Sequence, residues 1–250
     1  MNLFYQFSTL VVPSLAIAED DKPTGNEDED ESKFYKKAQD YWKKIPATID
    51  GVLGGYGHIS YTDIRGSEKF LRSIFQLDDA PKTKRALDCG AGIGRITKEL
   101  LINFFEKVDL VEQNEDFVKK APDIIGKTDR LGSLYVSGLQ NFEPEHKYDV
   151  IWSQWVLGHL TDGDFIKFFI TCRNALAENG VIIIKENVTS TPEIQLDEED
   201  SSVTRPLNML LELLARAGLK PIQTQTQTGF PKQLFPVKMI ALKPIDKKES

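Results

Sequence analysis

The sequence predicts an α/β fold in which helices cover both faces of a mostly parallel sheet. Short strand-like runs alternate with amphipathic helical runs from Lys84 onward. The runs 148–152 and 180–185 are largely apolar, as expected for strands buried on both faces of a parallel sheet. The last two runs, 220–225 and 236–242, are joined by a loop too short for a crossover helix, which predicts an antiparallel end.

Each element follows from the same reading of the pattern. We expect strands at 85–88, 108–112, 133–136, 148–152, 180–185, 220–225 and 236–242. We expect helices at 95–104, 115–121, 162–175 and 205–217. Gly218 directly follows the last helix, at the position where a left-handed residue commonly ends a helix.

The N-terminal part is expected to differ from this core. The apolar run 10–18 lacks a preceding basic residue and is too short to span a bilayer, so we interpret it as an extension rather than a targeting signal. The acidic segment 19–31 predicts a disordered linker, and Ser32 is a plausible helix N-cap. We therefore predict a disordered extension at 1–31 and one domain at 32–250.

Within that domain, a helical cap at 32–80 should precede a core at 81–245. Aromatic residues recur at helical spacing after Ser32, and 66–75 has the pattern of a second helix. The aromatic stripe could be helix core or could fold over a substrate channel. Four glycines between them indicate a sharply turning backbone, or one that lies close to a ligand.

Composition narrows the classes of function. The chain has 250 residues and a net charge of -7, which argues against a nucleic-acid substrate and suits a cationic one. The two cysteines, Cys89 and Cys172, form no metal-binding spacing and are expected to be buried thiols. We therefore expect no metal, no nucleic-acid partner and no membrane partner.

A glycine motif after the first strand indicates a nucleotide-like cofactor. The segment from Asp88 to Arg95 reads Asp-Cys-Gly-Ala-Gly-Ile-Gly-Arg, and Glu112 ends the next strand, where it can bind ribose hydroxyls. A dinucleotide site has the pattern G-x-G-x-x-G, and an acid at position 88 would repel a pyrophosphate. The motif instead favours S-adenosylmethionine, whose α-ammonium group suits the acid. A dinucleotide site and a non-catalytic glycine turn are the alternatives.

This motif resembles the first motif of the seven-strand S-adenosylmethionine-dependent methyltransferase fold. Three further segments carry a narrower resemblance: 53–60 (Leu-Gly-Gly-Tyr-Gly-His-Ile-Ser), 152–162 after the fourth strand, and Asp200-Ser-Ser with Arg205. Together they are similar to the eukaryotic protein N-terminal methyltransferases. These enzymes methylate the free α-amino group of proteins that begin Xaa-Pro-Lys after removal of the initiator methionine.

The resemblance implies a set of site residues. The cofactor-binding residues would be Asp88, Gly90, Arg95, Glu112, Gln113, Asn114, Leu139, Gln140 and Gln154. The substrate-binding residues would be Trp42, Leu53, Gly54, Trp155, Asp197 and Ser202. The catalytic residues would be His159, Asp200 and Asn187, of which Asn187 also holds the start of the peptide.

The chemistry of methyl transfer suits these residue types. An amine must be neutral to attack a sulfonium methyl group, and an α-amine has a pKa of about 7.7–8.0. His159 and Asp200 are residue types that can accept its proton, Trp155 offers a flat face for a proline, and Asp197 offers charge for a lysine. Each also has a structural interpretation: Trp155 and His159 could be core residues, and Asp197 and Asp200 could belong to a solvated acidic loop.

The sequence differs from the family pattern in two respects, and two alternative functions remain open. Glu112 and Glu186 stand where the family has Asp, and the segment between Asn187 and Asp197 is one residue longer. A methyltransferase for a small-molecule amine, or a non-catalytic cofactor-binding module, is the alternative function. A nucleic-acid methyltransferase is disfavoured because 153–156 reads Ser-Gln-Trp-Val instead of Asn-Pro-Pro-aromatic. We expect a monomer in the cytoplasm, the nucleus or both.

Overall fold

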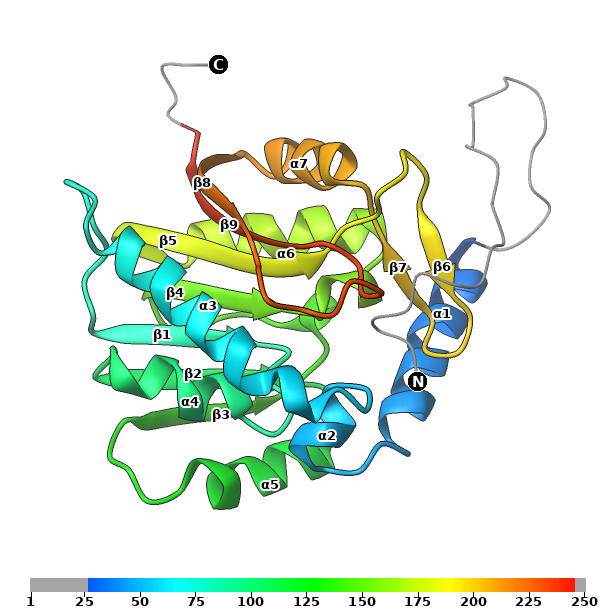
Figure 1. Ribbon diagram of the computed structural model, residues 1–250, viewed down its shortest axis with the longest axis horizontal. Helices are drawn as coiled ribbons and strands as arrows, with labels where there is room; N and C mark the ends of the chain where they lie inside the picture. Colours follow the sequence, from blue (N-terminus) through cyan, green and yellow to red (C-terminus); the bar gives the residue numbers. More distant parts are fainter. Residues whose placement is uncertain (1–26, 246–250) are drawn as a thin grey trace.

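The computed structural model describes residues 27–245, and its centre is a seven-stranded sheet between helical layers (Figure 1). The strands of this sheet are β1 (Arg85–Cys89), β2 (Lys107–Glu112), β3 (Leu131–Val136), β4 (Tyr148–Gln154), β5 (Leu176–Asn187), β8 (Leu219–Thr226) and β9 (Val237–Pro244). A separate two-stranded sheet contains β6 (Gln195–Asp197) and β7 (Ser202–Thr204).

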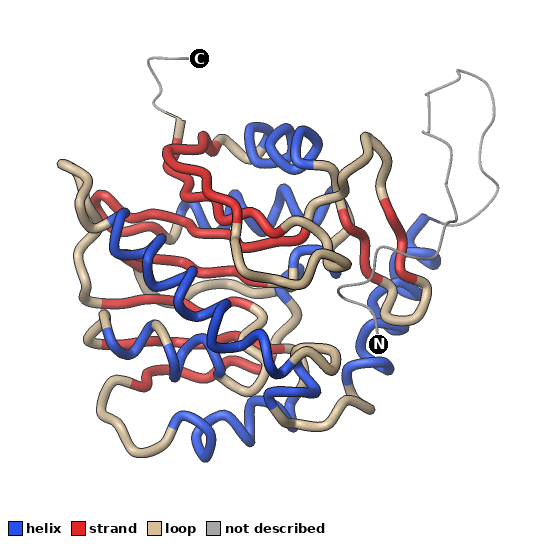
Figure 2. The backbone as a smooth tube through the Cα atoms, in the orientation of Figure 1, coloured by secondary structure: helices blue, strands red, loops and turns tan. Residues whose placement is uncertain are grey.

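The helices are α1 (Glu27–Trp42), α2 (Ile49–Val52), α3 (Ser60–Ile74), α4 (Arg95–Glu99), α5 (Glu115–Ile125), α6 (Asp162–Asn174) and α7 (Leu207–Arg216). Short 3-10 segments are η1 (Gly57–Ile59), η2 (Leu101–Asn103), η3 (Leu139–Asn141) and η4 (Leu157–His159). Figure 2 shows that helix and strand alternate along the core. The predicted α/β fold is confirmed.

The strand order is β3-β2-β1-β4-β5-β9-β8. The pairs from β3 to β5 are parallel, whereas β9 runs antiparallel between β5 and β8, as the short final loop predicts. The order of the chain reverses between β1 and β4. In an open parallel sheet, the loops after two such strands diverge and leave a crevice at the carboxyl ends.

Two apolar layers hold the helices on the sheet. On one face, Phe165, Phe168 and Phe169 of α6 pack with Ile151 and Ile182 of the central strands. Burying each of these aromatic side chains stabilises the fold by roughly 1.5–3 kcal/mol. The strands alternate their side chains between faces, so neighbouring residues serve the opposite layer.

On that opposite face, α3 and α4 pack against the same strands. Phe70 and Ile74 of α3 contact a cluster that includes Val150, Trp152 and Ile183. Trp152 is fully buried although it lies only two residues before the end of β4. These two layers place the ends of β1, β4 and β5 rigidly, and the site lies at those ends.

The start of the ordered chain differs from the prediction. Helix α1 begins at Glu27, so the expected disorder up to residue 31 and the N-cap at Ser32 are wrong for 27–31. Carboxylates near the start of a helix are favourable because of the helix dipole, which explains why an acidic run can be helical. The rest of the predicted extension, including 10–18, lies outside the described residues.

Other element boundaries also changed. The helix expected at 95–104 ends at Glu99 and continues as the 3-10 segment η2, while α5 runs to Ile125 through Pro122. The second cap helix begins at Ser60, six residues earlier than predicted. The β6–β7 hairpin was not predicted. Gly218, with a φ of 75°, ends α7 as expected.

In the described range, no helix is both long and apolar enough to cross a membrane.

Candidate active site

A cleft opens at the carboxyl ends of the parallel strands, between the sheet and the cap. Its empty volume is about 970 Å³, including its open mouth. Loops after β1, β2, β3 and β4 form one wall, and α1 and α2 form the other. The predicted site residues in its lining are Trp42, Leu53, Asp88, Gly90, Arg95, Glu112, Gln113, Leu139, Gln140, Gln154, Trp155 and His159.

The glycine motif forms a tight turn between β1 and α4. Gly90 has a φ of 67°, and a Cβ there would lie 2.4 Å from Cγ2 of Val156. The turn is held because the amides of Gly90 and Ala91 both donate to the carbonyl of Val111, at 2.9 and 3.1 Å. Only glycine therefore fits at position 90, and its backbone lines the cleft.

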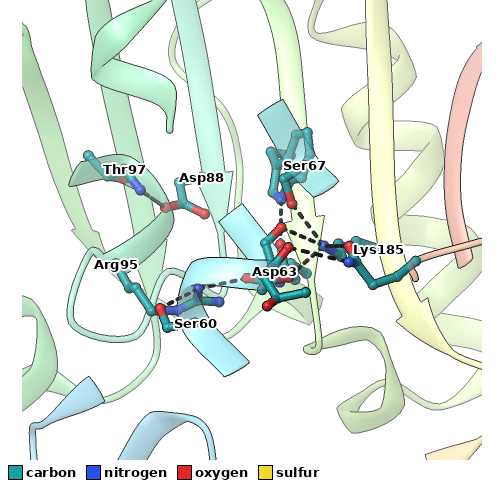
Figure 3. Close-up of polar contacts among 11 residues, drawn as sticks. Ser60, Asp63, Ser67, Asp88, Arg95, Thr97 and Lys185 are labelled. Carbon is teal, nitrogen blue, oxygen red and sulfur yellow. Dashed lines mark hydrogen bonds and ion pairs between the residues drawn. The ribbon is translucent and has the colours of Figure 1, made fainter. Parts of the chain in front are cut away.

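Asp88 lies beneath this turn and is 2% exposed. Its Oδ2 accepts hydrogen bonds from the amide and the hydroxyl of Thr97, at 3.0 and 2.7 Å (Figure 3). Burial raises the pKa of Asp88 to about 6, and the bonds from Thr97 oppose that rise. Asp88 therefore both anchors the start of α4 and lines the cleft.

Glu112 lies at the end of β2, and both of its carboxylate oxygens are fixed. Oε2 accepts from the amide of Gly92 at 3.0 Å, and Oε1 accepts from the amide of Asn114 at 2.9 Å. Burial raises the pKa of this carboxyl above its ordinary value. A carboxylate has about four lone-pair positions, so acceptor capacity remains for a hydroxyl group and the longer side chain still suits a ribose.

Asn114, which directly follows the cleft residue Gln113, is fixed by hydrogen bonds on both sides. Its Oδ1 caps α5 by accepting from the amides of Asp116 and Phe117, at 3.0 and 3.4 Å. Its Nδ2 donates to the carbonyl of Trp42 at 3.0 Å. The side chain thus connects the end of α1 to the core and is not part of the cleft lining described above.

Arg95 belongs to a buried ionic network that the sequence reading missed. Its Nη1 lies 2.7 Å from Oδ2 of Asp63, whose Oδ1 lies 2.5 Å from Nζ of Lys185 (Figure 3). Gln154 donates to both carboxylate oxygens of Asp63, at 2.9 and 3.0 Å. Asp63 and Lys185 are each 0% exposed. Lysine at the end of an otherwise apolar strand was the available signal, because a buried lysine needs acceptors.

The charges in this network adjust to one another. Burial opposes ionisation of Asp63, but Lys185 and Arg95 hold its pKa below the ordinary value. Burial lowers the pKa of Lys185 to about 8, and Asp63 counteracts that effect. With Asp63, Arg95 and Lys185 all ionised, the network carries one net positive charge beside the cleft. That charge suits an anionic group of a ligand.

The loop after β4 carries the predicted aromatic and imidazole groups. Trp155 has a φ of 53°, a left-handed conformation that costs a non-glycine residue on the order of 1–3 kcal/mol. Its amide donates to the carbonyl of Lys185 at 3.1 Å. The ring lies 6.2 Å from that of Phe230, measured between centroids. The strained backbone sets the direction of the indole at the cleft wall.

Glu186 and Arg205 hold the next residues of this loop. Oε1 of Glu186 accepts from the amides of Val156 and Leu157, at 2.8 and 2.9 Å. Arg205 donates to the carbonyls of Leu157 and Leu160, at 3.2 and 2.7 Å. Because both ends of η4 are fixed, the positions of Trp155 and His159 are set before any ligand binds.

His159 connects the sheet wall to the cap. Its Nε2 accepts from Nε1 of Trp42 at 2.9 Å, and the two rings meet edge to face. Nδ1 of His159 is buried and has no hydrogen-bond partner among the described residues. Burial lowers the pKa of His159 to about 4, although the nearby charge of Asp197 opposes that shift. The imidazole is therefore neutral at physiological pH, which differs from an unperturbed histidine.

The β6–β7 hairpin brings the acidic residues to the same side. The amide of Ser202 donates to Oδ1 of Asp200 at 2.9 Å, and Asp200 is 2% exposed. The hairpin packs on η4, because a Cβ on Gly158 would lie 2.8 Å from the carbonyl oxygen of Val203. Burial, together with nearby charges including Asp200 and Asp197, raises the pKa of Tyr41 on α1 to about 12.

The remaining predicted residues lie outside the cleft lining. Asp197, Asp200 and Ser202 are on the hairpin, and Asn187 is the last residue of β5, where it is 8% exposed. Gly54 follows Leu53 in the turn after α2, with a φ of 58°. Among residues 27–245, no cluster of His, Cys, Asp and Glu could hold a metal ion.

The cleft also contains residues that sequence analysis did not assign. On the cap side these are Tyr35, Ala38 and Val52, and on the sheet side they include Ala91, Gly92, Phe117, Ser137, Gly138 and Val156. The aromatic stripe of α1 supplied a signal for Tyr35, because it left open a helix over a channel. The structure supports that second reading for Trp42 and Tyr35, which face the cleft.

These features fit S-adenosylmethionine. The apolar residues Leu139 and Phe117 can flank an adenine, Glu112 can accept from ribose hydroxyls, and Arg95 can bind a carboxylate. No phosphate has to approach Asp88. The fold and the site therefore define the class of S-adenosylmethionine-dependent methyltransferases.

Comparison with known proteins narrows the class to one family. A family model described as AdoMet dependent proline di-methyltransferase matches residues 30–243. N-terminal Xaa-Pro-Lys N-methyltransferase 1-A of Xenopus laevis is 47% identical over 219 residues, covering 86% of this chain and 97% of that protein. Alpha N-terminal protein methyltransferase 1 of Drosophila melanogaster is 49% identical over 221 residues, covering 87% and 79% respectively.

A solved structure agrees with these relatives. A SAM-dependent methyltransferase from Leishmania major superposes with a TM-score of 0.81 at 40% identity, covering 88% of this chain and 87% of that one. The chain belongs to the AdoMet-dependent proline di-methyltransferase family. It is therefore an enzyme that uses S-adenosylmethionine, and the alternatives of a dinucleotide site and a non-catalytic module are not supported.

Proposed function

We propose that this enzyme transfers methyl groups from S-adenosylmethionine to the free α-amino group of proteins that begin Xaa-Pro-Lys. One observation carries the proposal: His159, on the wall formed by the loops after the strands, accepts a hydrogen bond from Trp42 of the cap, and the β6–β7 hairpin packs on η4, which contains His159. A donor site and an aromatic wall therefore share one cleft, and the carboxylates of the hairpin lie beside it. The names of the relatives from Xenopus and Drosophila support the same substrate class.

On the cofactor side, each residue has a distinct task. Arg95 receives the carboxylate of the methionine part, and the backbone of Gly90 lies against its chain. Glu112 accepts from the ribose, with Gln113 beside it, and Leu139 and Gln140 flank the adenine. Gln154 lies near the methionine part. When bound, the cofactor supplies a methyl group on a positively charged sulfur.

On the substrate side, the indole of Trp155 offers a face to the proline, and Trp42, Leu53 and Gly54 complete the channel. Asn187 holds the start of the peptide. Asp197, Asp200 and Ser202 receive the lysine at the third position. A carboxylate in a partly buried hairpin binds an ammonium more strongly than one in water, subject to the cost of desolvation.

Transfer requires a neutral amine. S-adenosylmethionine held by Gly90, Arg95 and Glu112 would supply the methyl group and would keep its sulfur as a neutral thioether, so the residues of this chain have to remove one proton from the amine. Burial raises the pKa of Asp200, which makes this carboxylate a stronger proton acceptor. His159 is neutral and its Nδ1 has no hydrogen-bond partner among the described residues, so it assists Asp200 in removing this proton.

The experiment is a methylation assay with a peptide that begins Ser-Pro-Lys. With isotopically labelled S-adenosylmethionine, mass spectrometry should place the label on the terminal nitrogen. An N-acetylated copy of the peptide should take no label, and a small-molecule amine offered alone should take none. Transfer to an internal lysine, or to the acetylated peptide, would overturn the proposal.

We further propose that the enzyme works as a monomer in the cytoplasm, the nucleus or both, without a nucleic-acid or membrane partner. The net charge of -7 supports a cationic substrate over a polyanion. Size-exclusion chromatography with light scattering tests the monomer, and imaging of a tagged chain tests the compartment. A stable dimer or a membrane-bound signal would contradict this part.

A further inference from the structure

The buried ionic network of Asp63, Arg95 and Lys185 lies next to the cleft. Only Arg95 of these three lines the cleft and can contact a ligand. Asp63 on α3 and Lys185 on β5 are both 0% exposed, and neither lines the cleft. Arg95 does line the cleft, although its residue is only 5% exposed. The three charges form a chain that runs from the core to the cleft wall (Figure 3).

Asp63 is the centre of this chain. One oxygen contacts Arg95 at 2.7 Å, the other contacts Lys185 at 2.5 Å, and Gln154 donates to both. A carboxylate held by three donors cannot turn without breaking several charge-assisted hydrogen bonds at once. The guanidinium of Arg95 is held in turn by this carboxylate, and its Nη1 also donates to the hydroxyl of Ser60 at 3.4 Å.

Lys185 is itself fixed from several directions. Its Nζ donates to the carbonyl of Asp63 at 3.1 Å, to the hydroxyl of Ser67 at 2.9 Å and to Oε1 of Gln227 at 2.8 Å. Gly66 allows this packing, because a Cβ there would lie 2.1 Å from Oε1 of Gln227. Lys185 therefore ties α3 to β5 and to the residue that follows β8, and it orients Asp63.

From this geometry we infer that Asp63 and Lys185 are positioning residues, which fix the Arg95 guanidinium where it binds the carboxylate of the cofactor. The inference rests on the proposed role of Arg95. It adds a requirement that the motif alone does not contain: an acid on the cap helix α3 and a lysine on β5 must hold the arginine of the glycine motif. The cap and the sheet thus build one subsite together.

Charge and position make opposite predictions for Asp63. If Asp63 acted through its charge alone, its removal would leave two cations and strengthen the binding of a carboxylate. If Asp63 positions Arg95, its removal frees the guanidinium and weakens that binding. Asp63→Asn therefore separates the two explanations. Lys185→Gln keeps a donor near Asp63 but removes the cation, and it provides a second variant if Asp63→Asn does not fold.

The test is calorimetric binding of S-adenosylhomocysteine and of its decarboxylated analogue, which keeps the adenosine, the sulfur and the amine. Asp63→Asn should weaken S-adenosylhomocysteine about tenfold, the value of one hydrogen bond to a charged group. Lys185→Gln should weaken it in the same direction. Both variants should bind the decarboxylated analogue as the unchanged enzyme does. Lys69→Gln, on the exposed side of α3, is the matched control.

The outcomes distinguish the inference from its premise. If Arg95→Gln binds both ligands normally, the proposed role of Arg95 fails. If Arg95→Gln loses S-adenosylhomocysteine selectively but Asp63→Asn binds it equally well or better, the positioning role fails. Equal weakening of both ligands in Asp63→Asn and Lys185→Gln would show a general distortion of the cleft and would also overturn the inference.

Discussion

At the scale of single residues, Asp200 is the strongest candidate for the proton acceptor. It is buried in the β6–β7 turn, and burial raises its pKa. We predict that Asp200→Asn lowers turnover about a hundredfold or more, the usual contribution of general base catalysis. Cofactor affinity should change little, because Asp200 lies outside the cofactor wall. Steady-state kinetics and calorimetry measure the two effects separately.

Glu198 provides the matched control for that change. It lies on the same turn and is exposed, so Glu198→Gln removes one charge without removing the proposed proton acceptor. Its turnover should stay close to that of the unchanged enzyme. Full activity in Asp200→Asn would remove Asp200 from the mechanism, and equal losses in both variants would indicate a general charge effect.

Glu186 gives a prediction about pH and stability. Burial raises the pKa of this carboxyl to about 7 from an ordinary value of 4.5. The folded state therefore binds more protons than the unfolded state between these values, and stability is lost as the pH rises through this window. Glu186→Gln does not titrate, yet its oxygen can still accept from Val156 and Leu157. The stability of the variant relative to the unchanged enzyme should therefore increase as the pH rises.

The measurement is the free energy of unfolding in urea at about pH 5 and about pH 8. The difference between variant and unchanged enzyme should shift in favour of the variant by roughly 2–3 kcal/mol between the two pH values. Comparing differences cancels any constant effect of the new amide. An unchanged difference would mean that Glu186 is not the source of the pH dependence.

At the scale of elements, helix α1 is held to the core by side-chain hydrogen bonds. The hydroxyl of Tyr35 donates to Oδ2 of Asp164 at 2.6 Å and accepts from the amide of Thr161 at 3.3 Å. Thr161 also donates to Glu31 at 2.8 Å. Since α1 carries Trp42 into the cleft, these bonds at the start of α6 determine where the cap wall stands.

We predict that Tyr35→Phe raises the KM for the peptide about fivefold, because about 1 kcal/mol of hydrogen bonding is lost from the cap contact. The free energy of unfolding should fall by less than ~1 kcal/mol, since the sheet layers are untouched. Kinetics and urea unfolding measure both. Tyr61→Phe on α3, where the tyrosine is 75% exposed, should change neither. An unchanged KM in Tyr35→Phe would contradict the role of this contact.

Elements with a strong local signal could be predicted from the sequence, and others could not. The glycine turn, β4 and β5 follow from apolar runs and spacing that depend on few distant residues. The hairpin was missed because β6 and β7 are three residues each and enclose an acidic turn that resembles a solvated loop. The start of α1 was missed because composition predicts disorder for an acidic run, while capping a helix with acids is favourable.

At the scale of the whole molecule, one ligand site joins elements that are distant in the chain. Binding of S-adenosylmethionine should therefore stabilise the whole domain against unfolding. At a free concentration of 100 times the Kd, a ligand adds about 2.7 kcal/mol, which corresponds to a rise in Tm of roughly 5–10 °C for a chain of this size. Thermal unfolding followed by fluorescence measures the rise. NAD at the same concentration should give none, and an equal rise would support a dinucleotide site instead.

Some features of the site could not be predicted from the sequence because they depend on contacts between distant parts of the chain. The fold class and most of the cleft lining follow from motifs, because the carboxyl ends of parallel strands meet at one edge. The pairing of Asp63 with Lys185 joins residues 122 positions apart, and nothing local to either residue names its partner. Likewise, the neutral state of His159 depends on burial by α1 and the hairpin, which only the assembled structure contains.

The two walls of the cleft are built differently. Hydrogen bonds from Glu186 and Arg205 fix the sheet wall from within the core, whereas α1 is bonded to the core through Tyr35 near its middle and Trp42 at its end. A compound that contacts only the sheet wall leaves the rate at which α1 detaches from the core unchanged. A compound that contacts both walls lowers that rate. Hydrogen exchange of the α1 amides therefore reports how far across the cleft a bound molecule reaches, and it could rank inhibitors by their span as well as by affinity.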